Sequence, residues 1–395
     1  MRALTFHGKR DVRVDNVPDP TVKEPTDAVV RITSTAICGS DLHLYELLGP
    51  FIEEGDILGH EPMGIVEEVG SEVKQIKPGD RVVIPFNISC GDCWMCNQGL
   101  YAQCETTQVH EHGKGASLFG YTKLYGEVPG GQAEYLRVPQ AHFGPIKVPR
   151  NSAPDERFLF LSDVLPTAWQ AVEYAAIPEG GTVAVYGLGP IGQMCTRIAR
   201  HRGAEIVIGV DRVPERLQMA ARYDVQLINS DEHDDVPSVI REMTGGRGPD
   251  GVIDAVGMEA HGAQFGKFAQ DAVGLLPKSV AAKAIEKFAV DRMEVLHHAI
   301  DTVRRGGTLS ISGVYGGQLD PMPLMQLFDK GVQIRMGQAH VKRWVDDIMP
   351  LLEKDDDPLG AEDLATHRLP LDRAPDAYEM FQKKRDGAIK IVLEP

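Results

Sequence analysis

Four cysteines lie within fifteen residues of one another, in the segment SCGDCWMCNQGLYAQC. They are Cys90, Cys93, Cys96 and Cys104. A loop rich in Gly and Asn can bring thiolates with this spacing onto one soft metal ion, and Zn²⁺ prefers four such ligands in a tetrahedron. A closed shell of four thiolates leaves no position for a substrate. The cluster therefore predicts a structural zinc site that holds a loop in place, and any catalytic chemistry must lie elsewhere.

Other interpretations of the cysteine cluster remain open. An iron–sulfur cluster is the main alternative, because the spacing C-x₂-C-x₂-C also begins the bacterial ferredoxin motif. That motif continues C-x₃-C-P, whereas here seven residues separate Cys96 from Cys104, and Glu105 follows. A coincidental spacing is the weaker alternative. Disulfides are disfavoured, because the start MRALTFHGKRDVRV is charged and has no apolar signal region, which predicts a reducing, cytoplasmic location.

Length and charge bound the class of protein. A chain of 395 residues is long enough for two domains. Its 41 Lys and Arg against 57 Asp and Glu give a net charge of −16, so nucleic acid is not an expected partner. No apolar run approaches the ~18 residues of a membrane span, so no membrane partner is expected.

The pattern of short segments predicts two domains. Up to about residue 156 the chain is a series of β-type segments separated by Gly and Pro, such as AVVRITSTAI and DRVVIPF. A helical segment over 156–177 follows, and then β-branched strands alternate with helices, which indicates βαβ units and a parallel sheet covered on both faces. We expect domains at 1–156, with 340–395 returning to the first domain, and at 157–339.

The segment VAVYGLGPIGQM predicts a dinucleotide site. Gly187, Gly189 and Gly192 form G-x-G-x-x-G between a strand and a helix, where glycines permit a tight turn, close approach of a pyrophosphate, and helix–strand packing. Asp211 follows Gly192 by nineteen residues, where a carboxylate can accept hydrogen bonds from both ribose hydroxyls. This favours NAD over NADP, although Arg212 weakens the preference. A glycine-rich turn without a ligand is the alternative.

A second group of metal-type residues lies upstream, in ICGSDLH and GHEPMG. Cys38 and His60 are one soft and one borderline ligand, which suits Zn²⁺. Asp41 could accept from the far nitrogen of His60 and fix its tautomer. Glu61 could lie behind the metal or enter it as a temporary ligand. The spacing of these residues does not by itself establish a metal site.

Taken together, these motifs resemble the zinc-dependent medium-chain alcohol dehydrogenases over nearly the whole chain. The matching segments are C-G-S-D-x-H from Cys38, G-H-E from Gly59, the four-cysteine loop and the glycine fingerprint. The resemblance implies an α/β fold, with a GroES-like, β-barrel-type catalytic domain and a Rossmann cofactor domain built on a doubly wound parallel sheet. It implies two Zn²⁺ per chain, one catalytic and one structural, with NAD, a small alcohol or aldehyde as substrate, and a homo-oligomer (dimer or tetramer).

The sequence departs from the family at one catalytic position. Where the family commonly has a second catalytic cysteine, this chain has Asp163 in LSDVLPTAW. An aspartate at this position is similar to the glutathione-independent formaldehyde dehydrogenase subgroup. Cys38, His60 and Asp163 are then the expected catalytic-zinc ligands. The alternative makes Glu61 the third ligand and Asp163 a helix cap. Thr167, four residues after Asp163, could contact the nicotinamide or lie inside the helix.

The resemblance also implies a proton path and a reaction. Ser40 would take the proton of the substrate hydroxyl and pass it through the nicotinamide ribose hydroxyl to His43, which opens to solvent. A buried structural role is the alternative for His43. The predicted function is hydride transfer between an alcohol or aldehyde hydrate and NAD, with formaldehyde as a candidate. The alternatives are a polyol- or threonine-type dehydrogenase and a catalytically retired nucleotide-binding protein. An insertion near 258–300 could cover the cofactor or form an oligomer contact. Lys390 is expected in solvent, with contact to a cofactor phosphate as the alternative.

Overall fold

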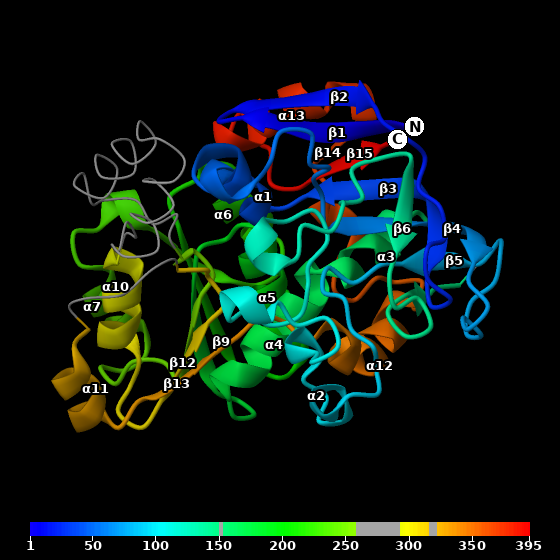
Figure 1. Cartoon of the computed structure of the whole chain (residues 1–395). Coiled ribbons are helices and arrows are strands. Elements are labelled where there is room, and N and C mark those ends of the chain that lie inside the picture. The colour runs from blue at the N-terminus through cyan, green and yellow to red at the C-terminus, as the bar shows by residue number, and fades with distance from the viewer. Residues whose placement is uncertain (150–152, 258–292, 316–321) are drawn as a thin grey trace. The chain divides into compact units, whose positions relative to one another are not determined.

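A computed structural model of the chain describes residues 1–149, 153–257, 293–315 and 322–395 (Figure 1). The chain divides into two compact units: unit 1 comprises Met1–Pro166 and Ala339–Pro395, and unit 2 comprises Thr167–Gln338. The expected insertion near 258–300 lies almost entirely outside the described residues. Among the helices that are described, none is long and apolar enough to cross a membrane.

Unit 1 is built on a seven-stranded mixed sheet. Its strands run in the order β14-β15-β3-β4-β5-β7, and β6 pairs with β3. Their bounds are β3 (Ala28–Ile37), β4 (Glu61–Val69), β5 (Arg81–Val83), β6 (Tyr135–Val138), β7 (Ile146–Lys147), β14 (His367–Pro370) and β15 (Ile391–Glu394). The last strand β15 inserts between β14, to which it is parallel, and β3, to which it is antiparallel. The end of the chain therefore completes a sheet begun near its start.

Two apolar cores hold unit 1 together. One packs the hairpin β1 (Arg2–Gly8) and β2 (Asp11–Asn16) against β15 and helix α13 (Ala374–Gln382), around buried residues such as Tyr378. The other lies among β3, β4, β5 and β6, around buried Val, Ile and Leu side chains. Strand β3 buries nearly every residue, as expected of a central strand covered on both faces.

Unit 2 is a six-stranded parallel sheet with the order β10-β9-β8-β11-β12-β13. The strands are β8 (Thr182–Tyr186), β9 (Ile206–Asp211), β10 (Gln226–Asn229), β11 (Gly251–Asp254), β12 (Thr308–Ile311) and β13 (Gln333–Met336). The order reverses between β8 and β11, which is the doubly wound arrangement that binds dinucleotides at the carboxyl ends of its central strands. The predicted fold class is confirmed.

Helices cover both faces of this sheet. They are α5 (Pro190–His201), α6 (Pro214–Ala221), α7 (Val236–Met243), α10 (Glu294–Thr302) and α11 (Leu324–Lys330). Buried side chains of α7, α10 and α11 share one core with alternate residues of the strands, including Ala184. The neighbouring Val183 and Val185, which point to the opposite face, are equally buried. Both faces of the sheet are therefore buried. This explains why its strands are rich in β-branched residues and do not alternate between apolar and polar residues.

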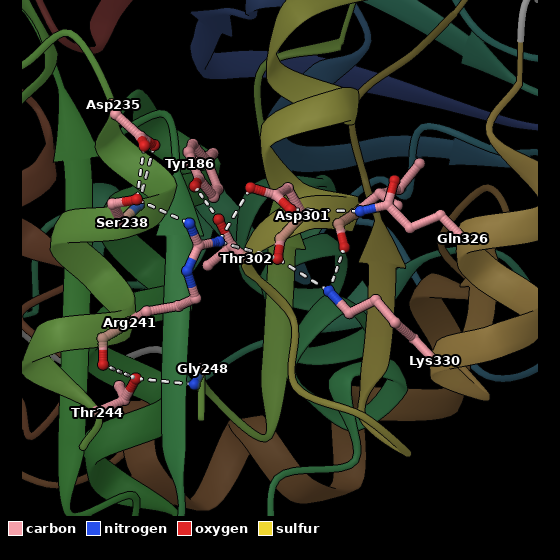
Figure 2. Close-up of polar contacts among 11 residues, drawn as sticks. Tyr186, Asp235, Ser238, Arg241, Thr244, Gly248, Asp301, Thr302, Gln326 and Lys330 are labelled. Atoms are coloured by element: carbon pink, nitrogen blue, oxygen red, sulfur yellow. Dashed lines mark hydrogen bonds and ion pairs between the residues drawn. The ribbon is translucent and has the colours of Figure 1, made fainter. Parts of the chain in front are cut away.

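A polar network joins α7, α10 and α11 (Figure 2). The Lys330 ammonium donates to the last carbonyls of α10, at 2.8 Å from Ile300 O and 2.8 Å from Asp301 O. From the other side, Arg241 Nη1 lies 2.9 Å from Asp301 Oδ2. Cations at a helix C-terminus satisfy its free carbonyls and complement its dipole. The network therefore fixes the end of α10 between two neighbouring helices.

The predicted helical segment over 156–177 is interrupted. It consists of α3 (Glu156–Leu159), a 3₁₀ turn over Phe160–Ser162, and α4 (Val164–Ala175). The break lies at Asp163, whose φ of −153° and ψ of −66° are not helical. Its carboxylate lies beside Cys38 and His60, 3.5 Å from each. Contacts with residues far away in the chain thus interrupt a sequence that is locally helical.

Candidate zinc and cofactor sites

The four clustered cysteines converge as one set of ligands. Their sulfur atoms all lie within 4.8 Å of one another, and no disulfide joins cysteines of the described residues. Backbone N–H groups point at the sulfurs, at 3.4 Å from Cys90 N to Cys104 Sγ and 3.4 Å from Cys93 N to Cys90 Sγ. Such donors stabilise thiolates, the form that binds metal. Four converging sulfurs fit a tetrahedral Zn²⁺.

The same loop is anchored to the chain's return into unit 1. The Ala102 N–H donates to His340 Nδ1 at 3.1 Å, and Asn87 Nδ2 donates to Ala339 O at 2.6 Å. Helix α12 (Val341–Leu352) begins directly after His340. The cysteine loop and the first residues of the returning segment therefore form one local structure.

A second group of ligand atoms comes from three separate segments of unit 1. Cys38 follows β3, and His60 precedes β4. Because β3 and β4 are antiparallel neighbours with Ala36 opposite Glu61, these two segments meet. Atoms of Cys38, His60, Glu61 and Asp163 all lie within 4.8 Å of one another. A thiolate, an imidazole and carboxylates form a donor set that suits Zn²⁺.

A buried network of polar side chains stands behind His60. Its Nδ1 lies 3.0 Å from Asp41 Oδ1. The other oxygen of Asp41 accepts from Cys38 N at 2.9 Å and from Gln132 Nε2 at 3.4 Å. Gln132 Oε1 in turn accepts from the Tyr378 hydroxyl at 2.8 Å. This arrangement leaves His60 Nε2 on the side of the other candidate ligands, as a metal-binding histidine requires.

Close packing against Gln132 explains the glycine that precedes His60. Gly59 has a φ of +97°, and a Cβ placed on it would lie 2.3 Å from Gln132 Cγ. Any other residue at Gly59 would displace the glutamine or the backbone on which His60 is held.

Glu61 is paired with a residue that was expected in solvent. Lys390 is fully buried, directly before β15, and its Nζ lies 2.5 Å from Glu61 Oε1. The expectation of a solvated lysine is therefore wrong. Burial is the largest influence and lowers the pKa of Lys390, but the negative charges of Glu61, Cys38 and Asp163 together hold that pKa above its usual value. Sequence reasoning also missed Gln132 and Tyr378, because no local spacing connects them with the metal-type motifs.

The two residues of the predicted proton path, Ser40 and His43, both lie on α1 (Gly39–Glu46). Ser40 Oγ is 3.3 Å from His60 Nε2, so its hydroxyl adjoins the candidate metal ligands. His43 is half-buried on the same helix. Two aromatic rings also stand edge-on to His60, with centroids 6.3 Å away for Phe86 and 6.5 Å away for Tyr121.

The glycine fingerprint of unit 2 forms a cradle between β8 and α5. A Cβ on Gly192 would lie 1.8 Å from Gly187 O, so only glycine allows this close packing. Gly187 has a φ of +86°, which a glycine adopts readily. The space beside Gly189 is open, with the nearest atom 3.9 Å from an added Cβ. An open backbone at a helix N-terminus fits a pyrophosphate group.

Asp211 ends β9 beside this cradle. Its Oδ2 accepts from Leu188 N at 2.7 Å, and its Oδ1 accepts from the backbone of Arg212 at 2.7 Å. Two arginines lie nearby, and both face carboxylates: Arg216 Nη1 is 3.6 Å from Asp211, and Arg212 Nη2 is 3.1 Å from Asp231. Thr167, the other predicted cofactor residue, belongs to α4.

The fold and the two groups of ligand atoms define a metal-dependent dehydrogenase, and comparisons with known proteins specify the family. Residues 24–150 match the alcohol dehydrogenase GroES-like domain, and residues 190–266 match the zinc-binding dehydrogenase domain. An uncharacterized zinc-type alcohol dehydrogenase-like protein of Bacillus subtilis is 41% identical over 100% of both chains. The formaldehyde dismutase of Pseudomonas putida is 30% identical over 100% of this chain and 97% of that protein.

Among solved structures, the alcohol dehydrogenase of Thermus sp. ATN1 is 35% identical, with a TM-score of 0.83 over 100% of this chain and 99% of that chain. The chain therefore belongs to the zinc-dependent alcohol dehydrogenase superfamily. As a member of it, the protein is an oxidoreductase that acts with zinc and a nicotinamide cofactor.

Proposed function

We propose that the protein oxidises a small alcohol or aldehyde hydrate with NAD, using one catalytic zinc held by Cys38, His60 and Asp163. The convergence of these side chains with Glu61, all within 4.8 Å, is the observation that carries the proposal. Bound Zn²⁺ supplies Lewis acidity toward a substrate oxygen, and the nicotinamide accepts the hydride. The four-cysteine loop would hold a second, structural zinc.

The chain's own residues supply orientation and proton transfer. Asp41 holds His60 with Nε2 facing the ligand group. Ser40, whose Oγ is 3.3 Å from that nitrogen, would accept the proton of the substrate hydroxyl as it gives up its own hydroxyl proton toward His43, and His43 would release a proton to solvent. We expect His43→Ala to lower turnover by about 10²-fold and to leave the zinc content unchanged. Unaltered turnover across pH would remove His43 from the path.

The ligand set is tested by separating Asp163 from Glu61. We expect Asp163→Ala to lose catalytic zinc and Glu61→Gln to retain it, with the four-cysteine zinc as an internal reference in both. The measurement is zinc per chain after dialysis. Full catalytic zinc in Asp163→Ala together with loss in Glu61→Gln would assign the third ligand to Glu61 instead.

Asp211 supports a preference for NAD. Its carboxylate stands beside the glycine cradle and would repel a 2′-phosphate. Both nearby arginines already face carboxylates, so neither is a free receptor for that phosphate. We expect Asp211→Gly to narrow the ratio of NAD to NADP affinity, and Asp231→Asn, which releases Arg212, to narrow it less. Tighter binding of NADPH than NADH by the unaltered protein would refute the preference.

The substrate class is proposed from two features. The rings of Phe86 and Tyr121 beside His60 favour a small substrate, and the similarity to a formaldehyde dismutase makes formaldehyde a candidate. NADH formation should be measured with formaldehyde, primary alcohols, secondary alcohols and polyols. A preference for polyols or threonine would favour that branch of the superfamily, and inactivity on all substrates would favour a protein that only binds nucleotide.

A further inference from the structure

The buried pair formed by Lys390 and Glu61 lies directly against the proposed ligands. Both side chains have no solvent exposure, and Nζ is 2.5 Å from Oε1. The second oxygen, Oε2, is buried and has no hydrogen-bond partner among the described residues. A carboxylate oxygen of Glu61 also lies within 4.8 Å of donor atoms of Cys38, His60 and Asp163. Glu61 is therefore a fourth potential ligand that is held on one side by a single cation.

Lys390 is itself fixed in place. Its carbonyl accepts from Thr366 N and Thr366 Oγ1, each at 3.0 Å. Its ammonium lies 5.8 Å from the centre of the Phe160 ring, within reach of a cation–π attraction. The lysine thus has a defined backbone position and a defined direction, so it does not act as a mobile surface charge.

Lys390 offsets the negative charge that Glu61 adds beside the proposed ligands. The Cys38 thiolate and the Asp163 carboxylate together neutralise a divalent metal ion. Glu61 adds one more buried negative charge, and Lys390 supplies the matching positive charge. Asp41 is the remaining carboxylate, and it faces His60 and two N–H donors. Removing one partner of a buried pair leaves the other partner with an uncompensated charge. That charged side chain is then attracted to the nearest group of opposite charge. For Glu61 that charge would be the metal.

We propose that Lys390 is a positioning residue that holds Glu61 away from the open coordination position of the catalytic zinc, so that this position stays available to substrate oxygen. The proposal depends on the ligand set under Proposed function. It adds a specific role for the last ten residues of the chain, which carry Lys390 and β15 into the sheet beside β3.

The test compares Lys390→Met, which keeps an unbranched side chain as far as Cε and removes the charged ammonium, with Lys390→Arg, which keeps the charge. Each protein is loaded with Co²⁺, whose visible spectrum reports the ligands and their number. We expect Lys390→Met to retain cobalt, to change its visible bands, and to release the metal to a chelator at least about tenfold more slowly. The KM for alcohol should rise by at least about tenfold, because Glu61 competes with substrate.

A second variant separates positioning from mere support of the fold. In Lys390→Met combined with Glu61→Gln, no carboxylate can enter the metal, so the spectrum should return toward that of the unaltered protein. Lys390→Arg should keep that spectrum throughout. The proposal is overturned if folded Lys390→Met shows unchanged bands and chelator release within about twofold of normal. It is also overturned if Lys390→Met loses the metal and Glu61→Gln does not restore it.

Failure of the underlying ligand set has a different signature. If Glu61 is already a ligand in the unaltered protein, Glu61→Gln alone loses cobalt while Asp163→Ala keeps it. That result would reject the proposed function of Asp163 before any variant of Lys390 is considered.

Discussion

The hydroxyl of Tyr378 fixes the amide of Gln132, which in turn donates to the Asp41 carboxylate beside the candidate ligand His60. Because this hydroxyl donates to Gln132 Oε1, the amide nitrogen of Gln132 must face the carboxylate of Asp41. Asp41 then adjoins Nδ1 of His60, which leaves Nε2 for the metal. The orientation of one imidazole thus depends on an amide and a phenol that lie outside every recognisable motif.

We expect Tyr378→Phe to lower the free energy of unfolding by about 1–2 kcal/mol, because Gln132 then keeps a buried acceptor without its donor. The catalytic zinc should be removed faster by a chelator. The control is Tyr45→Phe, since the Tyr45 ring lies 5.4 Å from that of Tyr378 and no hydrogen bond of its hydroxyl is found among the described residues. Equal effects of the two variants would show that the bond to Gln132 does not matter.

The sequence identified the metal-type residues but not their supports. Cys38 and His60 stand in motifs of the family, Asp163 replaces the cysteine that the family commonly has, and the structure brings the donor atoms of all three together. Lys390 could not be found in this way, because its partner Glu61 lies 329 positions earlier in the chain. The segment AIKIVL is apolar apart from its lysine, and a lone lysine in a strand is most often solvated, which predicts an exposed side chain. Only the pairing of distant strands makes that position internal.

At the scale of elements, the end of α10 is a test of how cations stabilise a helix terminus. We expect Lys330→Met to lower the stability of unit 2 by about 1 kcal/mol, because two C-terminal carbonyls lose a charged donor. Arg305→Met is the matched control, since Arg305 pairs with Asp329 at an exposed site, where an ion pair contributes about 0–1 kcal/mol. Urea unfolding of both variants measures the difference. If Arg305→Met lowers the free energy of unfolding as much as Lys330→Met does, a specific role for Lys330 is rejected.

The cysteine loop is the second element that can be tested in isolation. Cys96→Ser should reduce the zinc content by one ion per chain and increase proteolytic cleavage between residues 90 and 104, because the short α2 (Trp94–Asn97) lacks a core of its own. Cys195→Ser, which alters a buried cysteine of α5 outside the cluster, should leave the zinc content unchanged. Metal analysis that finds iron in the unaltered protein would restore the iron–sulfur alternative.

Elements could be predicted where local patterning and tertiary packing agree. The segment AVVRITSTAI corresponds to β3, and the helix after the glycine fingerprint corresponds to α5. The helical segment over 156–177 was predicted less well, because contacts of Asp163 with Cys38 and His60 interrupt it. A period of 3.6 residues in the sequence contains no information about such a contact.

At the scale of the molecule, one crossing from unit 2 to unit 1 lies at residues 338–339, and the next residue is a buried histidine. Burial and the nearby Arg343 lower the pKa of His340 to about 4. An unfolded histidine has its ordinary pKa near 6.5, so below that pH the unfolded chain binds a proton that the folded chain does not. Stability is therefore lost as pH falls from about 6.5 toward 4.

We expect the zinc-loaded protein to lose about 2 kcal/mol of stability between pH 7 and pH 5 through this one group. His340→Asn, which can still accept from Ala102 N–H, should lack that part of the pH dependence. The exposed His233→Asn should keep the profile of the unaltered protein. Chemical unfolding at pH 7 and pH 5 measures the free energy of unfolding of each protein. An equal loss of this free energy in His340→Asn and the unaltered protein would contradict the prediction.

The fold class followed from the sequence because glycines, β-branched strands and helical periods all indicate the same architecture. The order of strands in unit 1 could not be read in this way. The sequence of β15 does not indicate that it lies between β14 and β3. Strand pairing depends on backbone hydrogen bonds between segments that are distant in the chain.

The central place of β15 has a consequence during synthesis. Until β15 has been made, the sheet of unit 1 lacks an interior strand, and Thr35–Ile37 of β3 have no strand β15 to pair with. Glu61 is at that stage without its lysine. A chain truncated before Ile391 would keep this part of β3 unpaired, and we expect it to be prone to aggregation.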